Sequence, residues 1–169
     1  MSQRNIDRFV GGYQIIAGFV GIFLGLVLGF RALNSGTSPA PLLIMLVIGA
    51  MMAVFGGVVL AGVLLLEGHP AGRILSTGVQ VLQVPILSAA SVHWLFFAGA
   101  YLGLVWFGDQ TRLILGLKAN LEFGWAGAPQ ITGFGINVIP LIVLGLLWRP
   151  PALLAVSREP SAGPPRPAA

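Results

Sequence analysis

Cysteine is absent from this 169-residue chain, and charged residues are scarce. Without cysteine the chain has no disulfides, no thiol catalysis and no cysteine-ligated metal. Only 8% of its residues are charged, whereas roughly a quarter are charged in soluble globular proteins. So few charges cannot cover a surface in water, and the mean hydropathy is +0.92. The composition therefore predicts an integral membrane protein with the lipid bilayer as its surroundings.

Familiar catalytic and metal-binding signatures are also missing. The chain contains no G-x-S-x-G, no H-E-x-x-H and no phosphate-binding loop. Its two histidines, His69 and His93, are too few for a protein-ligated zinc or haem site. The eight arginines and one lysine are scattered without a basic stripe, so nucleic acid is not an expected partner. We expect no cofactor and no metal.

Four long stretches of the chain contain no charged residue. A helix that crosses the hydrocarbon core needs about 20 residues, and each stretch is at least that long. The predicted fold class is therefore an all-α integral membrane protein, a four-transmembrane-helix bundle. A single membrane domain, residues 1–149, would precede a proline-rich, disordered cytoplasmic tail, residues 150–169. The predicted spans are about 12–31, 42–66, 86–107 and 131–148.

The third charge-free stretch is too long for one perpendicular helix. At 1.5 Å per residue its 35 positions, Ile74 to Gly108, would reach about 52 Å, against a hydrocarbon core of about 30 Å. Pro85 removes a backbone donor and clashes with the preceding turn, so it is the natural point of division. Residues 72–84 would then be an interfacial segment before the third span. A single kinked and tilted third helix is the alternative.

A strand-like pattern lies in the predicted outer loop, residues 109–130. From Leu113 to Trp125 every odd position is apolar, and an alternation of period two is typical of a strand with one buried face. A weaker alternation over residues 134–138 could return as the second strand of a β-hairpin. The same residues are needed by the fourth helix, which is short even if it starts at residue 131. Both outcomes remain open at this stage.

The distribution of basic residues predicts the orientation. Cytoplasmic segments carry the excess of arginine and lysine. With the amino terminus inside, six arginines lie in cytoplasmic segments and three basic residues lie in outer loops. Both termini are therefore expected in the cytoplasm of a multi-pass protein.

Small residues recur at every fourth position of the first two predicted helices. Residues four apart share a helix face, and small side chains let two backbones approach closely in a bilayer. We expect the two helices to pack through these faces. The alternatives are that glycine is simply common in membrane helices, or that one face meets another copy or another protein. The two sets are Ala17, Gly21, Gly25 and Gly29, and Gly49, Ala53, Gly57 and Ala61.

Four polar side chains fall inside or beside the predicted spans: His93, Asn137, Gln80 and Gln83. Polar groups in a span either hydrogen-bond between helices or mark a ligand or proton site. Gln80 and Gln83 share a helix face with Ser76, a stripe expected to face the lipid headgroups or, as the alternative, a substrate.

The leading functional hypothesis is a small non-catalytic accessory, assembly or scaffolding subunit. It would act on another membrane protein, or on a second copy, through helix packing and its outer amphipathic segment. The alternative is a small transporter or channel whose path is lined by the four polar residues. A weaker third hypothesis is a lipid-modifying enzyme that uses the loop from Glu67 to Arg73.

Overall fold

The computed structural model describes residues 2–34, 41–88, 92–125 and 133–149. The predictions for the connection at 35–40 and the tail at 150–169 lie outside these residues. Over the described part the chain forms four helices and one four-stranded antiparallel sheet, so the all-α four-helix prediction is wrong. The elements are α1 (Gln3–Asn34), α2 (Pro41–Leu66), α3 (Pro70–Gln83), β1 (Pro85–Ser88), β2 (Val92–Phe107), β3 (Gln110–Trp125), β4 (Gly133–Asn137) and α4 (Val138–Leu147).

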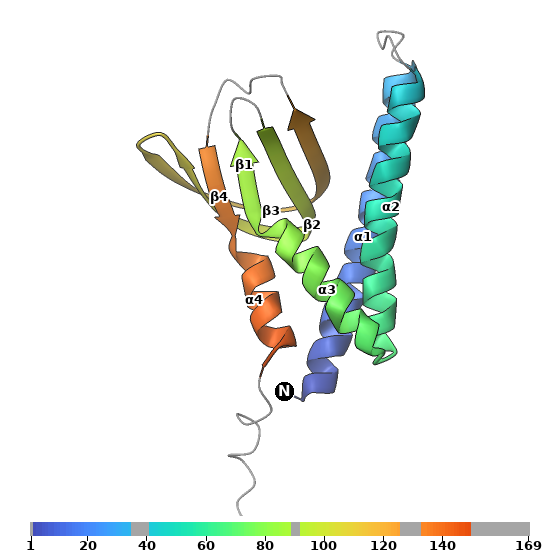
Figure 1. Ribbon diagram of the computed structural model, residues 1–169, viewed down its shortest axis with the longest axis vertical. Coiled ribbons are helices and arrows are strands. Elements are labelled where there is room, and N and C mark those ends of the chain that lie inside the picture. Colours follow the sequence, from blue (N-terminus) through green and yellow to red (C-terminus); the bar gives the residue numbers. More distant parts are fainter. Residues whose placement is uncertain (1, 35–40, 89–91, 126–132, 150–169) are drawn as a thin grey trace, which may run out of the picture.

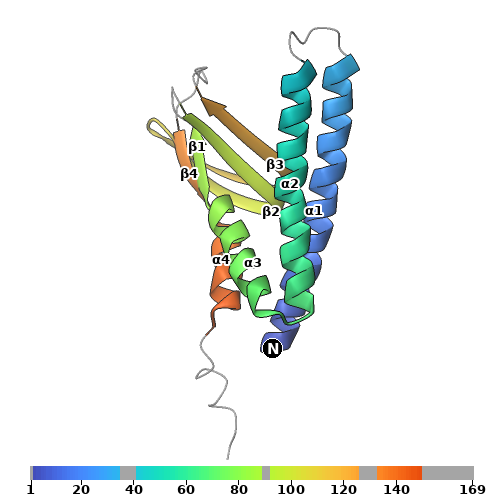
Figure 2. The ribbon, with the colours of Figure 1, turned by 45° about the vertical axis from the view of Figure 1, so that its right-hand side comes forward.

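Two of the helices, α1 and α2, are long and apolar enough to cross a membrane. Their 32 and 26 residues correspond to about 48 and 39 Å of helix. They lie side by side along the full height of the molecule, with the sheet, α3 and α4 on one side of them (Figures 1 and 2). The third predicted span, 86–107, contains strands β1 and β2, and α4 has only 10 residues, so neither later crossing exists as predicted.

Pro85 ends the third helix and begins the sheet. α3 stops at Gln83, because the proline two residues later has no N–H to donate and its ring clashes with the preceding turn. The following apolar run carries no helical or strand period, and such a run fits a buried helix and a buried strand equally. Residues 92–107 form a strand because they pair along their whole length with the 16-residue strand β3.

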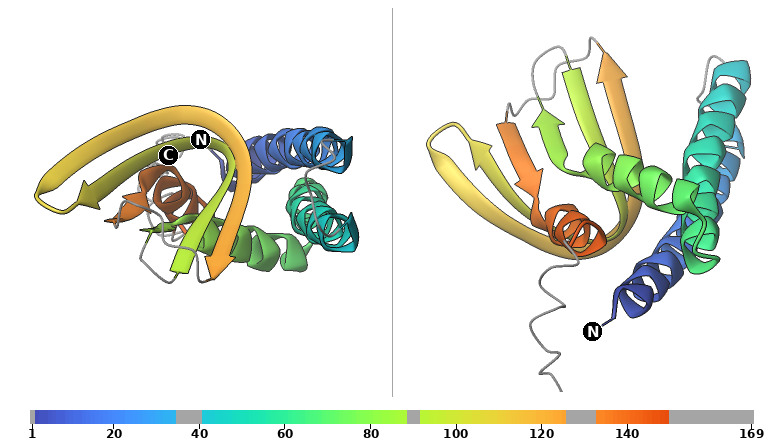
Figure 3. Two further views of the ribbon diagram at one scale, coloured as in Figure 1. Left: turned by 90° about the horizontal axis from the view of Figure 1, so that it is seen from above. Right: turned by 60° about the horizontal axis from the view of Figure 1, so that its bottom comes forward.

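The sheet closes on itself around a bend in β2. The strand order is β1-β4-β2-β3, and β1 also pairs with the first part of β2. β4 pairs with the last part of β2, from Gly103 to Trp106. Between these contacts lies Gly99, whose φ of +102° suits only glycine. The long β2–β3 hairpin therefore curves around α4 (Figure 3).

The main apolar core lies between the helix pair and the sheet. Phe55 of α2 is fully buried and meets Phe96 of β2 with ring centroids 5.9 Å apart. A second cluster joins the start of α1 to α4 at the lower end of the molecule. These two cores hold the bend of β2 against α1, α3 and α4.

Candidate functional site

The bend of β2 is held by three side chains instead of a neighbouring strand. The backbone N–H of Ala98 donates to Gln83 Oε1 at 3.0 Å, and the backbone N–H of Leu102 donates to Asn137 Oδ1 at 3.1 Å. Between them the Tyr13 hydroxyl accepts from the N–H of Ala100 at 2.7 Å and donates to the carbonyl of Ala98. Acceptors from α3, α1 and the last residue of β4 thus replace a missing strand edge, as buried backbone donors require.

Further buried amides extend this polar cluster. Ser76 of α3 donates to Gln14 Oε1 of α1 at 2.8 Å, and Gln80 lies one turn further along α3. These side chains, like Gln83 and Asn137, are at most 2% exposed. The amide nitrogens of Gln14, Gln80 and Asn137 have no protein acceptor within the described residues. The structure therefore brings Gln80, Gln83 and Asn137 into one buried region around the bend.

His93 lies away from this region. Its Nε2 is 3.0 Å from Glu122 Oε2 of the neighbouring strand β3. His93 lies ten residues before Gly103, the residue of β2 that pairs with Asn137. Burial raises the pKa of Glu122, but hydrogen bonds from Asn120 and His93 and the charge of Lys118 outweigh it, so the pKa lies below its usual value. The histidine belongs to a partly exposed ionic cluster on the sheet.

α3 is oriented inside out. Its polar stripe, Ser76, Gln80 and Gln83, faces the interior, whereas Ile74 and Val81 are 67% and 52% exposed. In water an amphipathic helix turns its apolar side inward. The polar stripe thus faces neither solvent nor lipid headgroups, contrary to the simplest expectation from the sequence.

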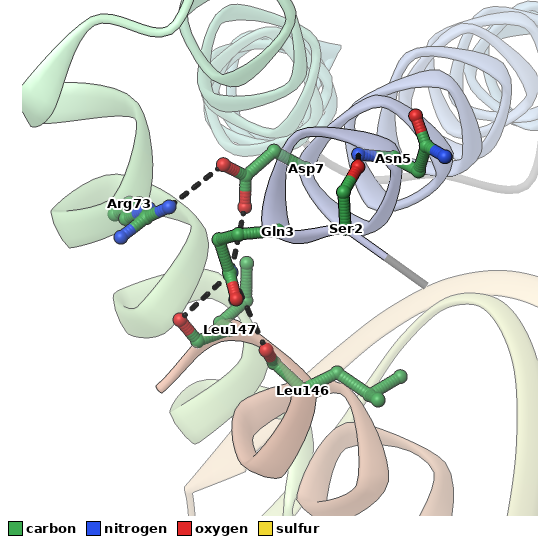
Figure 4. Close-up of polar contacts among 7 residues, drawn as sticks. All are labelled: Ser2, Gln3, Asn5, Asp7, Arg73, Leu146 and Leu147. Carbon is green, nitrogen blue, oxygen red and sulfur yellow. Dashed lines mark hydrogen bonds and ion pairs between the residues drawn. The ribbon is translucent and has the colours of Figure 1, made fainter. Parts of the chain in front are cut away.

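A polar clasp joins both ends of the described chain at the lower end of the molecule (Figure 4). Arg73 of α3 donates to Asp7 of α1 at 2.8 Å, and the Gln3 amide donates to the carbonyls of Leu146 and Leu147 at the end of α4. In the preceding loop His69 accepts from the N–H of Ala71 and caps α3. Of the residues of the proposed enzyme site, His69 therefore caps a helix and Arg73 forms an ion pair.

The two sets of small residues do not pack against each other. Those of α1 lie under large side chains of α2, since a Cβ on Gly21 would approach the Phe55 ring to 2.2 Å and one on Gly29 would meet Ile48. In the other set, Gly49 and Gly57 have no neighbour within 4 Å of an added Cβ. The closest approach between the backbones of α1 and α2 is at Gly62, where a Cβ would lie 2.6 Å from the Gly11 carbonyl oxygen.

An apolar groove of about 330 Å³ runs between α1 and the β2–β3 hairpin. Its α1 wall includes Val20 and Leu24, its sheet wall includes Leu117 and Ala119, and Lys118 supplies the one charged side chain. A groove of this size accommodates apolar side chains or a small apolar ligand.

The chemistry available at these sites is hydrogen bonding and packing. The buried cluster contains amides and hydroxyls, and no group of three or more metal-ligating side chains occurs in the described ranges. Sequence reasoning found Gln80, Gln83 and Asn137 but missed Tyr13 and Gln14. Gln14 was detectable as the one amide inside the charge-free stretch of α1. Tyr13 carried no signal, because its partners are backbone groups more than 80 residues away.

No family model, no curated protein and no solved structure matches this chain.

Proposed function

We propose that the protein is a non-catalytic membrane protein, an accessory or scaffolding subunit that acts through its apolar outer surface. One observation carries this proposal: burial is inverted over much of the molecule. Five polar side chains are at most 2% exposed, while many large apolar side chains on helices and strands are 37–84% exposed. Such an arrangement is stable when the surroundings are apolar, as in a bilayer or against other membrane helices.

The α1–α2 pair supports insertion. Only 28% and 11% of their most apolar windows are buried inside the molecule, whereas a core helix of a soluble protein would be mostly covered. We propose that the two helices cross the membrane as a hairpin. Arg4 and Arg8 precede the first crossing and Arg73 follows the second, with Arg31 between the crossings. The excess of basic residues favours a cytoplasmic location for the end of the molecule that holds the amino terminus.

A transporter with a path through the polar residues has less support. The oxygens of Gln83 and Asn137 already accept from the backbone of β2, and His93 lies in a separate cluster. The amide nitrogens of Gln14, Gln80 and Asn137 are the amide donors that remain without an acceptor in the described residues.

Membrane insertion and topology can be tested with single cysteines, because the chain has none of its own. Asn34→Cys, at the end of α1, and Glu67→Cys, just after α2, are both exposed. An impermeant maleimide added to intact cells should label Asn34→Cys and spare Glu67→Cys until the cells are lysed. Equal labelling of both would overturn the hairpin crossing, and release of the chain by an alkaline carbonate wash would overturn insertion itself.

A further inference from the structure

The outer edge of the sheet is a long strand without a partner. β3 is the last strand in the order β1-β4-β2-β3, and no other described strand pairs with its free edge. In the bend, the N–H groups of the even-numbered residues of β2 point away from β3. The odd-numbered residues of β2 therefore bond to β3, where their partners are even-numbered, as in Gly99 with Lys118. The odd-numbered residues of β3 thus present their backbone groups at the free edge.

The odd-numbered side chains in the first half of this edge are apolar and open. Leu113, Leu115 and Leu117 are 68%, 74% and 84% exposed. Natural proteins usually protect an edge strand with charges, prolines or bulges, because an open apolar edge invites another strand. β3 has three exposed leucines in its first half, so this edge is suited to pairing.

We propose that β3 pairs antiparallel with β3 of a second copy, about a two-fold axis through Leu117. Such an axis places residue i opposite residue 234 − i of the partner, where 234 is twice 117. Arg112 then faces the partner's Glu122, and by symmetry the same pair forms a second time. Opposite charges across a strand pair stabilise it. On the apolar face Leu113 meets the partner's Leu121, and the two Leu117 side chains meet at the axis.

The groove beside β3 supports the same register. The partner's Leu115 lies opposite Ala119, which lines the groove together with Val20 and Leu24 of α1. A leucine placed beside this small residue can enter the groove and cover apolar surface that the single chain leaves open. The partner therefore supplies a side chain to a site that is incomplete without it.

Three other registers are less favourable. An axis through Leu115 places Arg112 opposite the partner's Lys118, and an axis through Lys118 places the two lysines opposite each other; like charges at such positions are destabilising. An axis through Asn120 pairs Lys118 with Glu122, but it leaves Leu113 beyond the paired region. Among these registers, the one centred on Leu117 alone places an acidic residue opposite Arg112 and covers all three exposed leucines.

Cysteine cross-linking tests this register directly. In a hydrogen-bonded antiparallel pair the facing Cα atoms are about 5.5 Å apart, a distance that a disulfide spans. Leu117→Cys should therefore form a disulfide-linked dimer under mild oxidation, in membranes and after purification in mild detergent. Leu113→Cys is the matched control, since its copies would lie about 27 Å apart, eight residues along the strand. Equal cross-linking of the two variants, or none in either, would overturn the proposal.

Charge reversal provides a second readout that does not depend on cysteine chemistry. Arg112→Glu in the Leu117→Cys background puts two like-charged pairs in the interface and should weaken dimerisation about tenfold. Adding Glu122→Arg should restore it. Arg112 is exposed, and within the described residues its one side-chain hydrogen bond is to Gln110, so the fold does not depend on it. Unchanged cross-linking in the single variant would contradict the register. The inference does not require α1 and α2 to cross a membrane.

Discussion

At the residue scale, the side chains that matter most are polar acceptors in apolar surroundings. A buried N–H that loses its acceptor costs the full desolvation of that group, whereas the bond itself contributes less. Asn137 shows this clearly. It occupies the position before α4 where an asparagine normally caps the helix, yet its side chain makes no capping bond. Its side-chain oxygen instead accepts a hydrogen bond from the N–H of Leu102.

We expect Asn137→Leu to destabilise the protein by about 1–3 kcal/mol, because it leaves the N–H of Leu102 buried without an acceptor. Thermal unfolding in mild detergent, followed by tryptophan fluorescence, measures the effect. Gln110→Leu is the control: it removes an exposed amide at the β2–β3 turn and should change the stability by less than about 0.5 kcal/mol. Equal effects of the two variants would show that the bend does not need this acceptor.

Glu122 gives a pH-dependent contribution. Its pKa is lowered in the folded protein, so the ionised form favours folding. The contribution is complete above the usual glutamate pKa of 4.5 and is lost as the pH falls through the lower folded value. We expect the stability difference between wild type and Glu122→Gln to be below about 1 kcal/mol at pH 7, because the pair is partly exposed, and to vanish once the pH is below the lowered pKa of the folded protein. A difference that grows on acidification would contradict this sign.

At the element scale, α1 and α2 approach most closely through glycines outside the two predicted sets. Gly62→Ala should destabilise the pair by about 1–3 kcal/mol, because its Cβ would meet the Gly11 carbonyl, a backbone atom that cannot rotate away. Gly57→Ala lies five residues earlier on the same helix, has open space at its Cβ, and should be neutral or slightly stabilising. Denaturation in mixed micelles compares the two. A reversed order would place the contact on the predicted face of α2.

The sequence could reveal some elements and not others, for physical reasons. Charge-free stretches located α1 and α2, and alternation located β3. Its partner β2 is apolar throughout, so only a tertiary pairing distinguishes it from a helix, and the prediction of a third span was wrong. Residues 133–147 carried both a strand signal and a helix signal because both are present, β4 followed directly by α4. The buried amide side chains stood out in the sequence as polar residues in apolar stretches. The sequence did not show that Gln83 and Asn137 both accept from backbone N–H groups of the bend in β2.

At the scale of the whole molecule, the inverted burial distinguishes apolar surroundings from water. Met52 lies near the middle of α2 and is 37% exposed, while Leu66 is 43% exposed at its end. If α2 spans a bilayer, Met52→Lys should oppose insertion by about 2.5–3.5 kcal/mol and Leu66→Lys by much less. The membrane-inserted fraction after cell-free synthesis with vesicles measures both. In a water-soluble protein both lysines would be tolerated, so equal and small effects would argue against a spanning α2.

The bend in β2 also determines when the chain can finish folding during synthesis. Its three acceptors come from Tyr13, Gln83 and Asn137, so they emerge from the ribosome at the beginning, the middle and the end of the described chain. The amide of Leu102 stays unpaired until residue 137 has been made, even if the β2–β3 hairpin forms earlier. A nascent chain truncated before β4 would thus expose an open strand beside its apolar helices. Such a fragment exposes apolar surface and an unpaired strand and is prone to aggregation. The fold is therefore complete only after Asn137, the last residue of β4, has been made.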